Sequence, residues 1–354
     1  MEHSTPREQT SQPTTVLVGC YTDDEGTGGL QLVHADSEGL TATPVLDLPS
    51  PSWLELHDGR VLACSELAES LLSLVRIDQG EAQVLSQVPT GGAHACHLAV
   101  SPAGAWIAVA HYGSGEVTIH ATPIDDALEG ARGRLAFDGS GPDTERQDSS
   151  HAHQALWLDD EHVAVCDLGA DQLHVVGVDG QGSPTLVTSV NLPAGTGPRH
   201  AVPWHDEATG SAVPLDGHLY LAIAGELSGR VVLVRHEGLD WSTGWWVGQQ
   251  LSATSSPGQS QPSGLVWFGA DLVLANRGTD ELAMLAWRDG EHLQLVDLSP
   301  TGGSQTRDLR EVDGQLWVAN QDSDEVRRLR RAPDGFELVD AVAVTRPARL
   351  LPLA

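Results

Sequence analysis

One pattern recurs seven times along the chain and limits what the chain can fold into. Each copy has a short apolar strand that ends in a small residue, then two variable positions, a turn and a second strand. Copies lie about 44 to 58 residues apart, a spacing typical of propeller blades. Seven such copies, broken by Gly, Asp or Ser, predict an all-β, seven-bladed β-propeller. The small residues are Gly19, Cys64, Ala110, Cys166, Ala224, Ala275 and Ala319.

A second pattern, an opening strand, lies about a dozen residues before each hairpin. Its copies read PSWLEL, ACHLAV, AHQALWL, PRHAVPW, PSGLVWF, TRDLREV and PARLLPL. The first hairpin lacks an opening strand, and the last opening strand, at the C-terminus, lacks a hairpin. We therefore expect the strand near Leu350 to pair with the hairpin near Val18 and close the ring. The predicted organisation is a polar N-terminal tail, residues 1–14, and a single propeller domain, residues 15–354.

Charge restricts the function. The chain has 49 acidic and 19 basic residues, a formal net charge of -30, and every basic residue is Arg. Such a surface repels phosphate backbones, so we expect no nucleic-acid partner. Without Lys there is neither a Schiff-base lysine nor a P-loop lysine. An anion site must therefore use Arg, His or backbone N–H groups.

Other features predict a cytoplasmic protein without membrane contact. No run of 18 apolar residues is present, and residues 1–16 lack the basic start and apolar centre of a signal peptide. The four cysteines are far apart and show no CxxC spacing, which favours free thiols in a reducing compartment.

Two columns of the repeat hold polar residues that differ from blade to blade. A purely structural column tends to keep one residue type, whereas a site assembled from several blades need not. A strand that opens with Arg199 and His200 in GPRH fits a polar mouth at the propeller axis. The opening-strand column reads Ser52, Cys96, His153, Arg199, Ser263, Arg307 and Ala348. The hairpin column reads Tyr21, Glu66, Tyr112, Leu168, Glu226, Arg277 and Gln321.

Several segments resemble the seven-bladed lactonase family, which includes propeller-type 6-phosphogluconolactonases and carboxymuconate cyclases. They are GCYT, PSWLEL, CHLAVSPAGAWIAVAHYGSGEV, the RQ..HAH block at 146–153, CDLGADQLHV, GPRHAV, GELSG, ANRGTDEL and ANQDSDEV. The resemblance covers residues 15–354 and implies a site of one His, two Arg and one Glu. By position these are His153, Arg199, Arg277 and Glu226, which we expect to come from four successive blades and to face one side of the disc.

Lactone hydrolysis needs a base for water and a donor for the oxyanion. His153 or Glu226 could be the base, and Arg199 and Arg277 could clamp a carboxylate or phosphate. This chemistry requires no metal or cofactor, although His151 and His153 form a possible metal pair without an obvious third ligand. The remaining predicted substrate-binding residues are Glu66, His97, Tyr112, His151, His200, Arg307 and Gln321.

The sequence leaves three functions open. The chain could hydrolyse an anionic sugar lactone, act as a muconolactone-type cycloisomerase, or bind a ligand or protein without catalysis. Structural roles are also open, because Arg199 and Arg277 could form surface ion pairs with Glu66 and Glu226. His153 could be a hydrogen-bonded histidine between blades.

Overall fold

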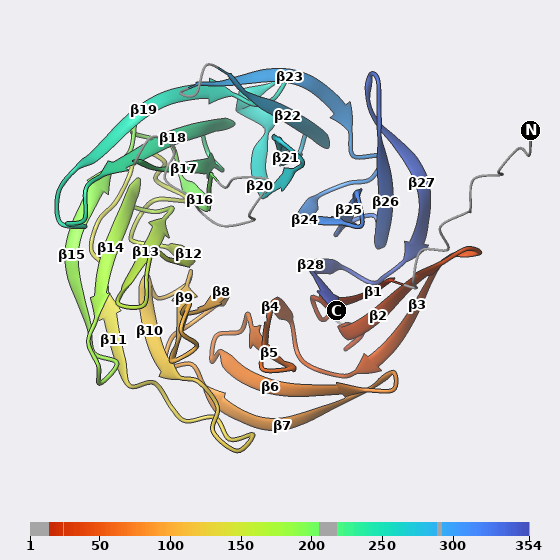
Figure 1. The fold of residues 1–354 in the computed structure, drawn as a ribbon, viewed down its shortest axis with the longest axis horizontal. Helices are drawn as coiled ribbons and strands as arrows, with labels where there is room; N and C mark the ends of the chain where they lie inside the picture. Colours follow the sequence, from red (N-terminus) through yellow and green to blue (C-terminus); the bar gives the residue numbers. More distant parts are fainter. Residues whose placement is uncertain (1–13, 24, 205–217, 289–291, 354) are drawn as a thin grey trace, which may run out of the picture.

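Short alternating runs of apolar and polar residues form antiparallel strands that are arranged in a ring (Figure 1). The computed structural model describes residues 14–23, 25–204, 218–288 and 292–353. In this part of the chain the strands form seven four-stranded sheets, which confirms the predicted seven-bladed propeller.

Each sheet runs from an innermost strand at the ring axis to an outermost strand at the rim. The sheet that contains both ends of the described chain has β28 (Pro347–Leu353), β1 (Thr14–Cys20), β2 (Gly29–Asp36) and β3 (Gly39–Leu46). The next two have β4 (Pro51–His57), β5 (Arg60–Ser65), β6 (Leu71–Asp78) and β7 (Glu81–Pro89), then β8 (Ala95–Val100), β9 (Trp106–His111), β10 (Glu116–Ala121) and β11 (Gly133–Ala136). The fourth and fifth have β12 (Ala152–Trp157), β13 (His162–Asp167), β14 (Gln172–Val178) and β15 (Pro184–Asn191), then β16 (Pro198–Pro203), β17 (His218–Gly225), β18 (Arg230–Glu237) and β19 (Trp245–Ser252). The last two have β20 (Gln261–Phe268), β21 (Asp271–Arg277), β22 (Glu281–Arg288) and β23 (His292–Pro300), then β24 (Thr306–Val312), β25 (Gln315–Asn320), β26 (Glu325–Ala332) and β27 (Gly335–Ala343).

The predicted opening strands are the innermost strands of the ring, as Figure 1 shows for β4, β8, β12, β16, β20, β24 and β28. Seven apolar clusters fill the spaces between neighbouring sheets. The small residue of the repeat is needed where a second strand approaches the next sheet. At Gly19, for example, an added Cβ would lie 2.2 Å from the carbonyl oxygen of Pro51.

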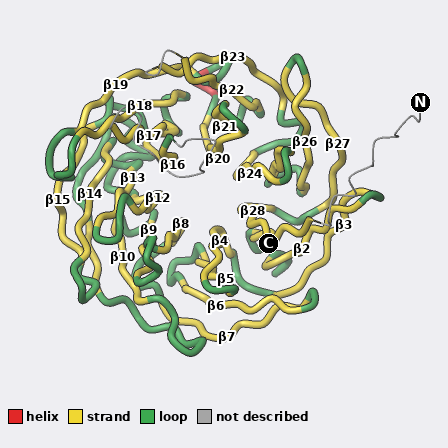
Figure 2. Tube along the Cα trace, in the orientation of Figure 1, coloured by secondary structure: helices red, strands yellow, loops and turns green. Residues whose placement is uncertain are grey.

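The ring closes as predicted. β28 pairs with β1 in antiparallel register, and Val18 lies opposite Leu350. The predicted polar tail lies outside the described residues except for Thr14, which begins β1. The helix of the described part is a single 3₁₀ turn, η1 (Pro257–Gln259), visible in Figure 2. No helix among these residues is long and apolar enough to cross a membrane.

Each innermost strand has a shift in its register at the residue of the opening-strand column. In β12 the pairing passes from Ala152 to Gln154, so His153 is the extra residue of a β-bulge. The same shift falls on Arg199 in β16 and on Arg307 in β24. A bulge re-aims a side chain, which lets this column point toward the ring axis instead of into a core.

The hairpin column is fixed beside the bulges by backbone hydrogen bonds. The N–H of Glu226 donates to the carbonyl of Gly197 at 2.8 Å, two residues before Arg199. The N–H of Glu66 makes the equivalent bond to Ser50 at 2.9 Å. The two columns therefore meet at the same end of the innermost strands.

Candidate functional site

A pocket of about 200 Å³ lies where the two columns meet. It contains all four predicted catalytic residues. The expected origin in four successive blades is wrong, because Arg199 on β16 and Glu226 just after β17 belong to one sheet. His153 and Arg277 come from the sheets on either side. The lining residues are Glu66, Cys96, Tyr112, Arg146, His153, Arg199, Glu226, Gln261, Arg277 and Arg307.

Glu226 is the centre of one wall of the pocket and is only 3 % exposed. Its Oε1 accepts a hydrogen bond from Nη2 of Arg146 at 2.7 Å. Its Oε2 lies 2.8 Å from Nη2 of Arg277 and 3.5 Å from Nη1 of Arg199. The Arg277 nitrogen makes no directed hydrogen bond there, so charge alone holds that contact. We call these four residues the Glu226 wall.

The arginines determine the protonation state of Glu226. Burial alone would raise the pKa of this carboxyl, but the charges of Arg277 and Arg199 outweigh burial and hold the pKa well below its usual range. Glu226 is therefore a permanent carboxylate whose two oxygens are already engaged. Such a group positions cations and is a poor proton acceptor.

His153 lies beside the Glu226 wall with its imidazole 7 % exposed. Nη1 of Arg199 is 2.6 Å from its Nε2. Because a guanidinium only donates, Nε2 must be the unprotonated nitrogen. Nδ1 then carries the hydrogen and lies 3.9 Å from Sγ of Cys96. Burial, and next the charge of Arg199, lower the pKa of His153 well below its usual value, so the ring is neutral at physiological pH.

Glu66 and Arg307 line the pocket on the side away from Glu226, and Tyr21, which is not a lining residue, connects them. We call these three residues the Arg307 wall. The hydroxyl of Tyr21 donates to Oε2 of Glu66 at 2.6 Å. Nη2 of Arg307 in turn donates to the Tyr21 oxygen. Among the described residues, no carboxylate forms an ion pair with Arg307, in contrast to the three arginines of the Glu226 wall.

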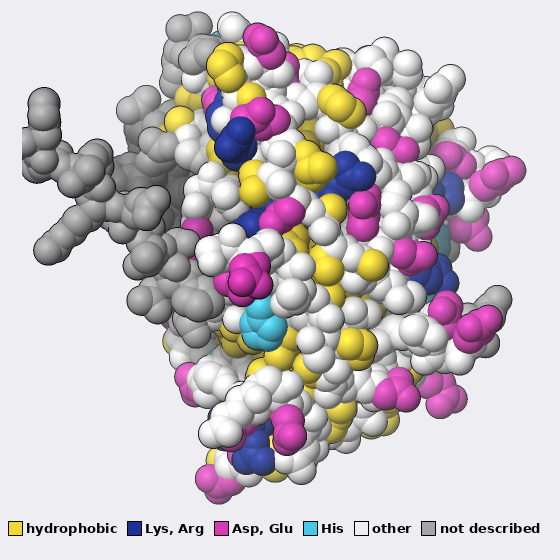
Figure 3. Space-filling view, turned by 90° about the vertical axis from the view of Figure 1, so that its right-hand side faces the viewer, with side chains coloured by type: hydrophobic (Ala, Val, Ile, Leu, Met, Phe, Trp, Pro, Cys, Tyr) yellow, Lys and Arg dark blue, Asp and Glu magenta, His cyan; other side chains and the backbone are white. Residues whose placement is uncertain are grey.

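The pocket carries net positive charge. Four guanidiniums, those of Arg146, Arg199, Arg277 and Arg307, face the two carboxylates Glu66 and Glu226. The chain as a whole has a formal charge of -30, and acidic side chains are spread over the face seen in Figure 3. Inside this negative surface, the pocket is a local positive well that favours an anionic ligand.

The predicted substrate-binding residues divide into two groups. Glu66, Tyr112 and Arg307 line the pocket, whereas His97, His151, His200 and Gln321 are not among its lining residues. The histidines miss the pocket because of local register. His97 and His200 directly follow the bulge residues Cys96 and Arg199, so their side chains point away from the pocket. His151 lies just before β12.

Of these outer residues, His151 supports the lining from behind, whereas His97 and His200 pack on Trp53. The His151 ring stacks on Tyr112 with centroids 4.5 Å apart, and its Nδ1 bonds to the Tyr112 carbonyl at 2.7 Å. His97 and His200 pack on Trp53, with centroids 3.9 and 5.2 Å from it.

Sequence reasoning gave no role to Arg146, which belongs to neither column. It lies in the long connection between β11 and β12, and connections do not follow the repeat. Its one signal was its place in the RQ..HAH block. Cys96 was in a column but without a role. Burial raises the pKa of its thiol well above the usual value, so it is not a ready nucleophile.

The possible metal pair is not supported by the geometry. Nε2 of His153 faces a guanidinium, and both ring nitrogens of His151 face oxygen atoms of Tyr112 and Asp148. Across the described part of the chain, no group of three or more His, Cys, Asp or Glu residues is arranged to hold a metal ion.

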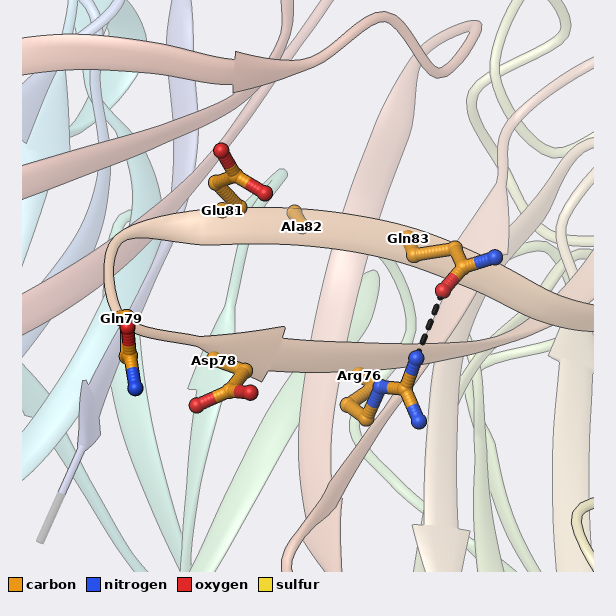
Figure 4. Close-up of a pocket in the computed structure, with 6 residues that line it drawn as sticks. All are labelled: Arg76, Asp78, Gln79, Glu81, Ala82 and Gln83. Atoms are coloured by element: carbon orange, nitrogen blue, oxygen red, sulfur yellow. Dashed lines mark hydrogen bonds between the residues drawn. The ribbon is translucent and has the colours of Figure 1, made fainter.

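A larger hollow of about 370 Å³ lies on the β6–β7 hairpin, away from the axis (Figure 4). Its lining side chains all come from this one hairpin, where Arg76 donates to Gln83 at 2.7 Å. None of them is buried. Because no buried polar groups converge there, the smaller pocket at the axis is the better candidate site.

The ring and its axial pocket define a seven-bladed propeller with an arginine-rich pocket at its axis. Residues 15–348 match the lactonase family of seven-bladed β-propellers, and the chain belongs to this family. An uncharacterized protein of Lactococcus lactis is 26 % identical over 321 residues, which cover 87 % of this chain and 89 % of the relative. An uncharacterized protein of Staphylococcus saprophyticus is 26 % identical over 346 residues, covering 92 % and 95 %.

Solved structures agree with this assignment. The periplasmic gluconolactonase of Pseudomonas aeruginosa superposes with a TM-score of 0.83 at 25 % identity, covering 97 % of this chain and 99 % of that one. A candidate 6-phosphogluconolactonase of Bacteroides fragilis superposes with a TM-score of 0.84 at 23 % identity, covering 98 % and 99 %, and this likeness concerns the fold. Family membership and these neighbours support a lactonase.

Proposed function

We propose that the protein hydrolyses an anionic sugar lactone of the 6-phosphogluconolactone type, with His153 as the base. The observation that carries this proposal is the neutral His153 held against Arg199 inside a pocket of net positive charge. A pocket of about 200 Å³ suits a small ligand. An anion is drawn to the four guanidiniums, and the carbonyl of a bound lactone can meet Arg199.

In the proposed reaction, the carbonyl of the bound lactone first draws Nη1 of Arg199 away from Nε2 of His153, which frees the lone pair of this nitrogen. A water molecule then attacks the carbonyl carbon while Nε2 takes its proton, and Arg199 donates to the oxyanion that forms. The ring C–O bond breaks, and the imidazolium returns its proton to the departing alkoxide. The product is an open-chain hydroxy acid, which ionises.

Glu226 is the alternative base, but its surroundings favour a positioning role. Three guanidiniums lie at its two oxygens and hold its pKa low. We propose that it keeps the arginines in place and limits their repulsion. Glu226→Gln should then change both substrate affinity and turnover, because the arginines lose their common partner.

The test is a rate assay with purified protein on 6-phosphogluconolactone, gluconolactone and carboxymuconolactone, corrected for spontaneous hydrolysis. We expect the phosphorylated sugar lactone to be the best substrate. His153→Gln should lower its turnover by about 100- to 10,000-fold, the usual contribution of a general base. His292→Gln, at an exposed position on β23, is the matched control.

Other outcomes would choose between the remaining functions. Turnover of carboxymuconolactone alone would replace the proposal with cycloisomerase chemistry. If the protein accelerates the hydrolysis of none of these lactones but binds a sugar acid tightly, a non-catalytic propeller is favoured.

We retain a cytoplasmic location as a proposal. The four cysteines are free and buried, which fits a reducing compartment. A gluconolactonase with the same fold is periplasmic, so fractionation of cells that express the full chain is the direct test.

A further inference from the structure

The two walls of the pocket differ in how their charges are balanced. In the Glu226 wall, three guanidiniums share one carboxylate. In the Arg307 wall, a single guanidinium meets a neutral hydroxyl, that of Tyr21. Within the described part of the chain, Arg307 is therefore the lining arginine that forms no ion pair with a carboxylate.

Hydrogen-bond directions in the Arg307 wall follow from a single proton. The Tyr21 hydroxyl has one hydrogen, and Oε2 of Glu66 accepts it at 2.6 Å. The Tyr21 oxygen must then be an acceptor for Arg307, which can only donate. This relay fixes all three side chains before any ligand arrives.

Unused hydrogen-bonding capacity remains on this wall. A guanidinium has five N–H donors, and Arg307 uses one on Tyr21. Oε1 of Glu66 accepts no hydrogen bond from the described residues. Because both residues line the pocket, the wall offers an incoming ligand several cationic donors and, beside them, one carboxylate oxygen.

We infer that the Arg307 wall is the specificity subsite, where Arg307 binds an anionic substituent of the substrate and Glu66 accepts a hydrogen bond from an adjacent hydroxyl. The lactone carbonyl then lies at the opposite wall, against Arg199 and His153. This inference rests on the proposed function and adds the orientation of the substrate and the groups it must carry. The substrate class is a hydroxylated lactone with its anion remote from the reacting carbonyl.

Arg307 and Glu66 together should distinguish two anionic lactones that positive charge alone would bind equally well. A phosphorylated sugar lactone offers both a phosphate for Arg307 and hydroxyl donors for Glu66. Carboxymuconolactone has carboxylates but no hydroxyl group, so its second anion would meet the Glu66 carboxylate without a proton between them. Two carboxylates that meet without a shared proton repel each other, so the pocket should reject this compound.

Two substitutions test the two halves of the subsite. Arg307→Gln should raise KM for 6-phosphogluconolactone by about 10- to 100-fold, the usual effect of losing a hydrogen bond to a charged group. For uncharged gluconolactone, the KM of this variant should stay within about twofold of the wild type. Glu66→Gln should raise KM for both sugar lactones and improve the binding of carboxymuconolactone. Arg230→Gln, at an exposed position on β18, controls for the general loss of one positive charge.

Binding measured apart from catalysis distinguishes the two proposals. Titration calorimetry with 6-phosphogluconate, gluconate and inorganic phosphate, on wild type and Arg307→Gln, needs no turnover. If the wild type hydrolyses no lactone but loses affinity for 6-phosphogluconate on Arg307→Gln, the proposed function fails and the subsite stands. If the wild type is an active lactonase and Arg307→Gln affects charged and uncharged lactones equally, the subsite is overturned. Unchanged melting temperatures would show that the variants fold.

Discussion

Two buried arginine–carboxylate clusters lie close to the ring axis and have the same ingredients. In the Glu226 wall, one carboxylate serves three arginines. In the second cluster, Oδ2 of Asp308 lies 3.3 Å from Nη1 of Arg349 and 3.6 Å from Nη2 of Arg310. Asp308 also accepts the backbone N–H of Leu350 at 2.9 Å. Glu226 is 3 % and Asp308 2 % exposed, so burial does not distinguish them.

The two clusters differ in the hydrogen-bond partners of the guanidinium N–H groups that do not contact the carboxylate. Arg310 donates to the carbonyls of Leu350 and Leu309 at 3.2 and 3.0 Å. Arg349 donates to the carbonyl of Leu54 at 3.3 Å, and its guanidinium carbon lies 3.6 Å from the Trp53 ring centroid. These contacts connect β24, β28 and β4, which belong to three neighbouring sheets.

In the Glu226 wall, the guanidinium N–H groups mostly bind side chains or have no hydrogen-bond partner. Nε of Arg199 is buried without a partner, and Arg277 makes one backbone contact, from Nε to the carbonyl of Gln261. The same ion-pair chemistry is therefore structural where guanidiniums bind backbone carbonyls and open to a ligand where they do not. Substitutions in the two clusters should accordingly affect stability and activity in opposite ways.

The largest expected effect comes from removing the closing strand. Deletion of residues 346–354 removes β28, with it Arg349, and leaves one edge of β1 unpaired. We propose that the ring is one cooperative domain, so the loss should exceed a total stability of about 5–15 kcal/mol and leave no folded protein. Circular dichroism and solubility measure this against the full chain. A truncated protein that melts sharply near the wild-type temperature would contradict it.

Asp308→Ala should be the most damaging single substitution among these charged residues. It leaves the buried guanidinium of Arg349, the partly buried guanidinium of Arg310 and a backbone N–H without their shared carboxylate, which costs about 3–5 kcal/mol. Denaturant unfolding measures the loss, and Asp78→Ala, at an exposed position, is the control. The activity of the remaining folded molecules should be unchanged. A loss of activity with full stability would place Asp308 in the site instead.

Arg199→Ala should show the reverse pattern. Glu226 keeps two arginines after this change, and the repulsion among the cations falls, so the free energy of unfolding should fall by less than the about 3–5 kcal/mol that breaking a buried ion pair usually costs. The rate should fall by about 100- to 1000-fold in kcat, as when an oxyanion donor is lost. Kinetics and denaturant unfolding on the same preparation measure both. A large loss of stability would show that this arginine is structural after all.

The repeat explains how much of this contrast could be predicted from the sequence. The opening-strand and hairpin columns recur in every blade, so membership of a column predicts where a residue lies in the ring. As expected from their columns, four residues line one pocket: His153, Arg199, Glu226 and Arg277. The closing strand followed from counting opening strands and hairpins. Both inferences use backbone register, which repetition fixes.

Side-chain direction next to a bulge, and reach from a loop, are not fixed by repetition. His200 follows Arg199 directly but packs against Trp53, and Arg146 reaches Glu226 from a connection that no other blade shares. The sequence also could not show that Arg277 would share Glu226 while Arg307 would not. Long side chains choose among several partners, and only the assembled ring decides which is nearest.

Arg146→Ala should have a smaller effect than Arg199→Ala. The Arg146 side chain is 34 % exposed, and it connects Oε1 of Glu226 with the Tyr112 hydroxyl, 3.3 Å from its Nη2. Its loss should weaken substrate binding by about 3- to 10-fold, since Arg199 and Arg277 still hold Glu226. Most of the change should appear in KM and little in kcat. Arg146→Lys should recover only part of the affinity, because an ammonium cannot keep both contacts.

The smallest expected effect is the pH dependence of the wild type, and it tests the neighbourhood of His153 most directly. Burial and the charge of Arg199 lower the pKa of His153, so its neutral, proton-accepting form persists as the pH falls. Between pH 7.5 and 6, kcat/KM should change by less than about twofold. A histidine with an unperturbed pKa near 6.5 would lose about fourfold over this interval. In Arg199→Ala the charge is gone while burial remains, so NMR titration of the labelled histidine should show the His153 pKa moving upward. An activity that falls in the wild type with a midpoint near pH 6.5 would mean either that His153 is not the base or that Arg199 does not control it, and the titration decides between the two.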